Sequence, residues 1–297
     1  MKRVLCFLRR LAFAALAGWA SIASAQHHGG LQFALVKTGS TDSRAGLSYA
    51  DGSLMQPFRF NYIAVLVKHR SGTLLYDTGL GTRVDQQAAA DSPWWAKLLA
   101  GYEHLNPARR QLDAAGEPLP TRIFLSHAHW DHISALEDFP EAQVWVTVAE
   151  REFVRHGKPP AVWPSQVASK RIHWKEFAYE SKPVLGFDQT LDLFGDGNAV
   201  LVAMPGHTPG STGLLLTTDS GNRYFFVGDT VWNAAAIGAE SPKSWLGRRF
   251  ADSDVAQVRA QIGKLRKLQQ LLPDMVIVPA HDATVQDKLG YFPQWVK

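Results

Sequence analysis

Most apolar residues of this chain fall in short runs that are closed by Gly, Pro, Asp or His. Residues 62–67 and 200–204 are typical, and such runs between turn-forming residues predict buried β-strands. Residues 255–272 show helical spacing instead, with Ser253 as the expected cap and Pro273 as the stop. Residues 123–156 alternate between strand and helix patterns. This alternation predicts an α/β fold.

The remaining pattern adds loops and further elements to this frame. Residues 58–68 and 73–76 predict a hairpin that leads to Asp77, while residues 38–57, rich in Gly, Ser and Asp, predict a long loop. A helix is expected at residues 133–139. From residue 185 the chain predicts a series of short strands, at residues 190–194, 199–204, 213–218, 223–227 and 275–278.

The first 25 residues differ from the rest of the chain. Basic residues precede the apolar run 11–20, and Ala23-Ser24-Ala25 has the form of a cleavage site. A membrane anchor is the alternative, but the run is too short to span a bilayer comfortably. We therefore expect a secretory signal peptide at residues 1–25 and a single domain at residues 26–297. The mature chain would be periplasmic or secreted without stable membrane insertion, and export by the Sec or the Tat route stays open.

Removal of this segment changes the charge of the chain. The full sequence has 31 Lys and Arg against 27 Asp and Glu. The four basic residues of the segment leave with it, so 27 charges of each sign remain and the formal net charge is zero. A neutral chain gives no support for nucleic-acid binding. The only cysteine, Cys6, is also lost, so neither disulfides nor thiolate ligands are expected in the mature protein.

The richest candidate chemistry is Ser126-His127-Ala128-His129-Trp130-Asp131-His132, which follows the predicted strand at residues 123–125. We call residues 126–132 the metal loop. A strand that ends in this loop can direct His127 and His129 to one side of a site and Asp131 and His132 to the other. The spacing therefore predicts two divalent metal ions. Imidazole and carboxylate ligands without thiolate suit Zn²⁺, with Mn²⁺ or Fe²⁺ as alternatives.

Three later strand ends carry one further candidate ligand each. His207 lies in a Pro-Gly-His-Thr-Pro-Gly segment after residues 200–204, Asp229 follows residues 224–227, and His281 follows residues 275–278. A lone His or Asp after a strand is usually a turn residue. A role as metal ligand is favoured for each of these three residues, because the metal loop supplies further ligands that could bind the same ion.

Asp77 has two interpretations on the sequence alone. It is followed by Thr78-Gly79, and an Asp close to a Gly suits a turn. Alternatively, it lies beneath the metal loop and accepts hydrogen bonds that hold the loop backbone or a ligand imidazole.

These five motifs, in their order along the chain, resemble the metallo-β-lactamase superfamily, and the resemblance favours the second interpretation of Asp77. It implies a four-layered αβ/βα sandwich with a binuclear site at the sheet edges. Carried over residue by residue, it implies that the first metal ion is bound by His127, His129 and His207. It implies that the second metal ion is bound by Asp131, His132 and His281, and that Asp229 bridges the two ions.

Within that family the pattern is most similar to N-acyl-homoserine lactonases. The resemblance implies cleavage of an ester or lactone bond by a metal-bridging hydroxide, which Asp131 orients and deprotonates. A bridging Asp229 departs from the true β-lactamases, which disfavours penicillin-type hydrolysis. The lactonases have a tyrosine that binds the substrate carbonyl where this chain has Trp232, whose indole N–H can donate a hydrogen bond but which offers no hydroxyl.

Several alternatives stay open at this point. Residues 232–250 form either an apolar wall suited to an acyl or aryl group of a small-molecule substrate, or an ordinary surface helix and loop. A phosphotriesterase, a broad arylesterase, a β-lactamase and a mononuclear iron persulfide dioxygenase are competing functions. The sequence does not define the oligomeric state.

Overall fold

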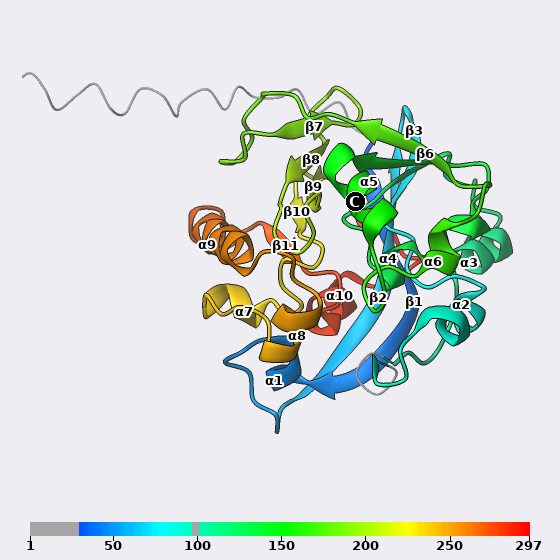
Figure 1. Ribbon diagram of the computed structural model, residues 1–297. Coiled ribbons are helices and arrows are strands. Elements are labelled where there is room, and N and C mark those ends of the chain that lie inside the picture. The colour runs from blue at the N-terminus through cyan, green and yellow to red at the C-terminus, as the bar shows by residue number, and fades with distance from the viewer. Residues whose placement is uncertain (1–29, 97–100) are drawn as a thin grey trace, which may run out of the picture.

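A computed structural model describes residues 30–96 and 101–297 (Figure 1). The predicted signal peptide therefore lies outside the described residues. The described chain contains two β-sheets that face each other, and helices cover the outer face of each sheet.

The first sheet has six strands in the order β1-β2-β3-β4-β5-β6. The first three strands are antiparallel, and β3 to β6 are parallel neighbours. The bounds are β1 Gln32–Arg44, β2 Pro57–His69, β3 Gly72–Tyr76, β4 Arg122–Phe124, β5 Gln143–Thr147 and β6 His173–Phe177.

The second sheet has five strands in the order β11-β10-β9-β8-β7. All neighbours are antiparallel except β10 and β11, which are parallel. The bounds are β7 Thr190–Asp192, β8 Ala199–Ala203, β9 Thr212–Thr217, β10 Arg223–Phe226 and β11 Val276–Val278.

Side chains alternate between the two faces of each strand, and in central strands such as β2 and β8 both faces are buried. In β2, Val65 and Val67 pack between the sheets, whereas Ala64 and Leu66 face the helices outside the first sheet. In β8, Leu201 likewise packs between the sheets and its neighbours face the helices of the second sheet. This arrangement confirms the predicted αβ/βα sandwich.

The helices form the two outer layers. Those on the first sheet include α3, α4 and α5, and the long helix α9 packs on the second sheet (Figure 1). The bounds are α1 Ala45–Ser48, α2 Val84–Asp91, α3 Ala108–Ala115, α4 Trp130–Ile133, α5 Val148–His156, α6 Pro164–Val167, α7 Ala235–Gly238, α8 Trp245–Phe250, α9 Val255–Leu271 and α10 Ala283–Leu289.

Three details of the sequence prediction are wrong. Residues 38–44 are not loop but continue β1, because β2 pairs with them as far as Arg44. The cap of α9 is Asp254, whose side chain accepts the Gln257 N–H at 3.0 Å, rather than Ser253. The helix expected at residues 133–139 is split into α4 and a short 3₁₀ turn at Leu136–Asp138.

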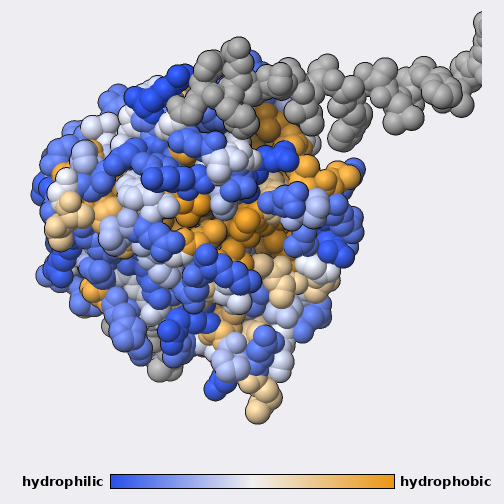
Figure 2. All heavy atoms as spheres, turned by 180° about the vertical axis from the view of Figure 1, so that it is seen from behind, coloured by the Kyte–Doolittle hydropathy of each residue, from blue (hydrophilic) through white to orange (hydrophobic). Residues whose placement is uncertain are grey.

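Figure 2 shows the face opposite to that of Figure 1, where hydrophilic residues surround a central group of apolar ones. Among the described residues, no helix has the length and apolar character that crossing a membrane requires.

Candidate metal centre

Four strand ends at one edge of the sandwich bring the candidate ligands together. The metal loop follows β4 and runs into α4, and its histidines and Asp131 are buried. His207 follows β8, Asp229 follows β10 and His281 follows β11. The β10–β11 pairing is parallel, so Asp229 and His281 leave the second sheet at the same edge.

The candidate ligand atoms form two groups, and the atoms within each group lie within 4.8 Å of one another. One group contains His127, His129, His207 and Asp229, and the other contains Asp131, His132 and His281. The sequence prediction divided the ligands in the same way, with Asp229 shared between the groups.

The Asp229 carboxylate lies between the two groups, and its Oδ2 is also 3.2 Å from His281 Nε2. Asp229 Oδ2 lies 3.5 Å from His207 Nε2 and 3.9 Å from His127 Nε2. Asp229 Oδ1 lies 3.1 Å from His281 Nε2 and 3.3 Å from His132 Nε2. A carboxylate in this position can contact a metal ion on each side.

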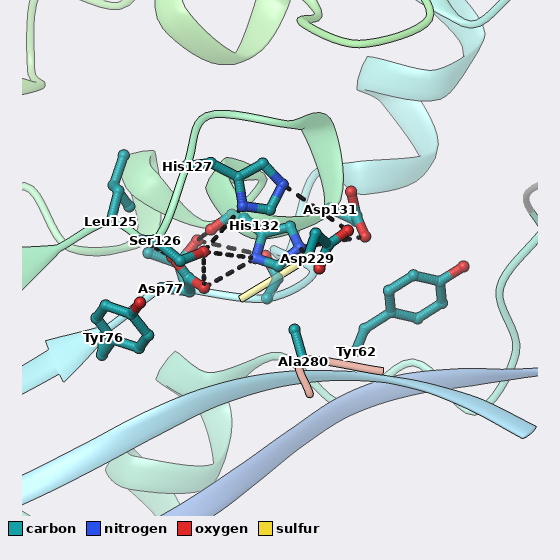
Figure 3. A network of polar contacts seen from close by, with 12 residues as sticks. Tyr62, Tyr76, Asp77, Leu125, Ser126, His127, Asp131, His132, Asp229 and Ala280 are labelled. Atoms are coloured by element: carbon teal, nitrogen blue, oxygen red, sulfur yellow. Dashed lines mark hydrogen bonds and ion pairs between the residues drawn. The ribbon is translucent and has the colours of Figure 1, made fainter. Parts of the chain in front are cut away.

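Asp77 lies beneath the metal loop and accepts several hydrogen bonds from it (Figure 3). Its Oδ1 accepts the Ser126 N–H at 2.6 Å. Its Oδ2 accepts the Ser126 hydroxyl at 2.6 Å and lies 2.8 Å from His132 Nδ1. Asp77 adopts a left-handed backbone conformation with φ 59°, which Asp tolerates better than most residues. Contact with Asp77 leaves Nε2 of His132 directed at the site.

Glu150 is a buried carboxylate that the sequence analysis did not single out. It accepts hydrogen bonds from Ala128 N at 2.6 Å, Thr208 Oγ1 at 2.6 Å and Gly210 N at 3.0 Å. Glu150 therefore joins the metal loop to the His207 loop. Its position three residues after Thr147, the cap of α5, fits a capping box, so local sequence gave no sign of these distant contacts.

A second buried group supports His207. Asp252 Oδ1 lies 2.8 Å from His207 Nδ1 and also accepts a hydrogen bond from Lys243 Nζ at 2.7 Å. Lys243 Nζ lies 3.3 Å from the Thr230 carbonyl oxygen as well. Nothing in the spacing of Lys243 and Asp252 pointed to the site, because they meet His207 only through the fold.

The first group keeps its imidazoles neutral. Burial, together with the neighbouring His132 and His207, holds the pKa of His127 well below its usual range. Burial and His207 do the same to the pKa of His129. Burial and the Lys243 ammonium lower the pKa of His207. Neutral imidazoles have a free nitrogen lone pair, which a metal ligand requires.

The second group is shaped by carboxylates. Burial lowers the pKa of His132, but Asp77 and other carboxylates outweigh this effect and raise it well above its usual range. Burial also lowers the pKa of His281, but the Asp229 carboxylate outweighs this effect and raises the pKa above its usual value. Burial acts against ionisation of Asp229, but His281 and His132 hold its pKa well below the usual range. The site thus concentrates negative charge where a cation would bind.

These residues fit a pair of divalent metal ions. The donor set contains imidazole nitrogens and carboxylate oxygens, which suit Zn²⁺ and similar ions. Within the described part of the chain, His132 Nε2 and Asp229 Oδ1 are buried and lack a hydrogen-bond partner. Buried polar atoms without partners are costly, and a bound cation would satisfy both of them.

A cavity of about 1160 Å³ reaches the two groups from one side. His129, Asp131, Asp229 and His281 line the cavity at the site. Much of its apolar lining comes from β2, from the segment after α2 and from residues 232–250, and it includes Phe58, Phe60, Trp95, Trp232, Leu246 and Phe250. Residues 232–250 therefore form part of a pocket wall.

Trp232 lines this cavity, but its indole N–H points toward the candidate metal ligand Asp229. The indole Nε1–H donates to Asp229 Oδ2 at 2.7 Å, and the ring packs edge-on against Phe60 at 5.7 Å between ring centroids. This hydrogen bond occupies the single donor of the indole. Trp232 is therefore committed to Asp229 in this structure, rather than free to bind a substrate carbonyl.

Two facing sheets with a cluster of histidines and aspartates at one edge define a metallo-β-lactamase-type protein. The model of the metallo-beta-lactamase superfamily matches residues 60–281, which is more than half of the chain. The chain belongs to this superfamily. A probable metallo-hydrolase from Mycobacterium tuberculosis is 28% identical over 235 residues, which cover 73% of each protein. Family membership and this relative support a metal-dependent hydrolase.

Solved structures share the fold. A structure of AiiA from B. thuringiensis, with N-decanoyl-L-homoserine bound at the active site, matches with a TM-score of 0.68 and 17% identity, covering 90% of this chain and 100% of AiiA. AidC, a dizinc quorum-quenching lactonase, matches with a TM-score of 0.58 and 19% identity, covering 85% of this chain and 88% of AidC. At these identities the likeness establishes the fold alone.

Proposed function

We propose that the chain is an exported binuclear metallohydrolase that cleaves an ester or lactone bond of a small molecule. The observation that carries this proposal is the placement of the Asp229 carboxylate between the two groups of ligands, 3.5 Å from His207 Nε2 of one group and 3.1 Å from His281 Nε2 of the other. A site for a single ion would have no use for a carboxylate shared in this way. The mononuclear iron dioxygenase is therefore disfavoured.

Each ligand has a defined place in this proposal. His127, His129 and His207 would hold one ion, and Asp229 would bridge to the other. Asp131, His132 and His281 would complete the second position. Two divalent ions, most simply Zn²⁺, would supply a hydroxide nucleophile near neutral pH and polarise the substrate carbonyl.

The protein itself would contribute proton transfer and orientation. Asp131 Oδ2 lies 3.3 Å from His281 Nε2, and Asp131 lines the cavity. It is therefore placed to orient the attacking group and to accept its proton. Asp77 and Asp252 hold the far nitrogens of His132 and His207, which keeps both rings directed at the site.

The cavity supports a substrate with an apolar acyl or aryl group. Phe60, Trp232 and Leu246 offer apolar surface beside the site, and burial of such a group would favour binding. The fold shared with N-acyl-homoserine lactonases is consistent with a lactone substrate.

A substrate panel tests this proposal. The mature protein, loaded with Zn²⁺ or with Mn²⁺, is assayed on lactones, aryl esters, phosphotriesters and β-lactams. We expect preference for lactones or esters, loss of activity on chelation, recovery with metal, and at least about a 1000-fold loss in His127→Ala. Activity confined to phosphotriesters would refute the substrate class, and activity unaffected by chelation would refute the metal chemistry.

Export is a separate part of the proposal and has its own test. Expression of the full chain in a Gram-negative host, followed by fractionation and N-terminal sequencing, should give a periplasmic protein that begins at Gln26. A cytoplasmic protein that retains Met1 would refute it.

A further inference from the structure

Lys243 is a buried cation to which the proposed reaction gives no role. Its side chain is 1% exposed, and that of its partner Asp252 is 0% exposed. Lysine is almost never fully buried unless it is paired. Asp252 satisfies the charge of Lys243, but the position of the pair calls for a separate explanation.

Both hydrogen-bond partners of the Lys243 ammonium lie directly behind candidate ligands. Asp252 Oδ1, which accepts from Lys243 Nζ, also contacts His207 Nδ1. The Thr230 carbonyl oxygen, 3.3 Å from the same Nζ, belongs to the residue after Asp229. Lys243 therefore links the loop after β8 to the loop after β10, and each loop carries one ligand.

Lys243 also packs against the wall of the cavity. It lies just before α8, and its Nζ is 5.5 Å from the centre of the Trp232 ring. Gly247 in α8 is in close contact with both residues, because a Cβ there would meet Trp232 at 2.8 Å and Lys243 Cβ at 3.0 Å. The neighbours of Gly247 in α8, Leu246 and Phe250, line the cavity.

We propose that Lys243 is a positioning residue with two effects. It fixes the loop that carries His207 relative to the loop that carries Asp229, and it fixes the position of α8, which forms part of the cavity wall, relative to the metal centre. The inference rests on the proposed metal centre. Lys243 touches neither the reacting atoms nor a metal ion. It acts through Asp252, which orients His207, and through the backbone beside Asp229.

The first experiment measures metal affinity directly. Zn²⁺ binding to the mature protein is followed by competition with a chromophoric chelator for wild type, Lys243→Met and the control Lys267→Met. Lys267 is exposed on α9, remote in sequence from the ligands. We expect Lys243→Met to bind one of its ions about 10- to 100-fold more weakly, as is typical when the support of a metal ligand is lost. The control should match the wild type.

Two further readouts separate positioning from general stability. The Co²⁺-substituted Lys243→Met protein should show altered visible absorption bands, because the His207 imidazole would reorient. Its KM for a substrate with a bulky apolar acyl group should rise more than its KM for an acetyl ester, because only the larger group reaches the α8 wall. Unchanged cobalt bands together with equal KM changes would overturn the proposal.

A double variant tests whether Lys243 merely neutralises Asp252. Lys243→Met combined with Asp252→Asn removes both buried charges. The amide oxygen introduced at position 252 can still accept a hydrogen bond from His207 Nδ1. It is also the test protein if the unpaired Asp252 carboxylate prevents the single variant from folding. We expect zinc affinity to stay at least about 10-fold below wild type, because the link to Thr230 is still missing.

The outcomes distinguish this inference from the proposed function. If the double variant bound zinc as tightly as wild type, the positioning role would be refuted, because neutralisation of the Asp252 charge would then explain why Lys243 is buried there. Affinity in Lys243→Met equal to that of Lys267→Met would overturn it as well. A wild-type protein that binds no ion would refute the metal centre itself, and this proposal with it.

Discussion

Glu150 gives the sharpest prediction about stability, because its burial has a measurable dependence on pH. Burial raises the pKa of the Glu150 carboxyl from its ordinary 4.5 to about 7, although hydrogen bonds from Thr208, Ala128 and Gly210 act in the opposite direction. A carboxyl with a raised pKa binds its proton more tightly in the folded chain than in the unfolded chain. Its contribution to stability is therefore fully present below pH 4.5 and is lost as the pH rises through 7.

The expected size follows from the two pKa values. The difference corresponds to about 3 kcal/mol of folding free energy that wild type loses between pH 4.5 and pH 8. In Glu150→Gln the amide cannot ionise, so this loss disappears. The free energy of unfolding of the variant, relative to wild type, should therefore rise by about 3 kcal/mol across this range. Below pH 4.5 the amide and the protonated carboxyl are similar, and the two proteins should differ by about 1 kcal/mol or less.

Urea unfolding of both proteins, stripped of metal and followed by tryptophan fluorescence between pH 4.5 and pH 8, measures this difference. Glu152→Gln, an exposed position in the same helix, is the matched control, and its difference from wild type should change by less than about 0.5 kcal/mol over this range, because its ion pairs with Arg155 and His156 are at the surface. A difference between Glu150→Gln and wild type that stays constant with pH would refute the reasoning.

Three further predictions concern the loop, its packing and the cavity. Asp77→Asn replaces an acceptor beneath the metal loop with an N–H donor, so zinc affinity should fall about 10- to 100-fold in a chelator competition, and unchanged affinity would contradict the role of Asp77. Gly210→Ala places a Cβ 2.3 Å from Glu150 N and should cost about 3 kcal/mol or more in thermal unfolding, whereas Gly238→Ala, whose Cβ meets no described atom within 4 Å, should stay within about 0.5 kcal/mol of wild type. Equal melting temperatures would contradict this account of the packing. Phe250→Ala removes part of the cavity wall and should raise KM for a bulky apolar acyl substrate about 10-fold with little change in kcat, and a KM within about twofold of wild type would argue against the wall.

The sequence predicted the sheets and the candidate ligands because both depend on short local patterns. Each ligand follows an apolar run, so the end of a strand could be located before the fold was known. His207 and His281 could be placed with the metal loop because the motifs, in their order along the chain, resemble those of the metallo-β-lactamase superfamily. These features do not require knowledge of distant contacts.

The remainder depends on contacts between distant parts of the chain. Residues 38–44 are polar and rich in Gly and Ser, yet they form a strand because β2 pairs with them. Glu150 contacts Thr208 across 58 residues of sequence, and Asp252 contacts His207 across 45. No local pattern marks such residues. The role of Trp232 also needed the structure, because its N–H could have pointed to substrate or to Asp229.

If Asp229 is shared by two metal ions, the protein should bind two ions per chain, and a measurement of metal content decides this. The mature protein, saturated with Zn²⁺ and freed of excess ion, is analysed for metal per chain beside Asp229→Ala. The account predicts about two ions per chain in wild type and one or fewer in the variant. One ion per chain in wild type, or two tightly held ions in Asp229→Ala, would contradict it.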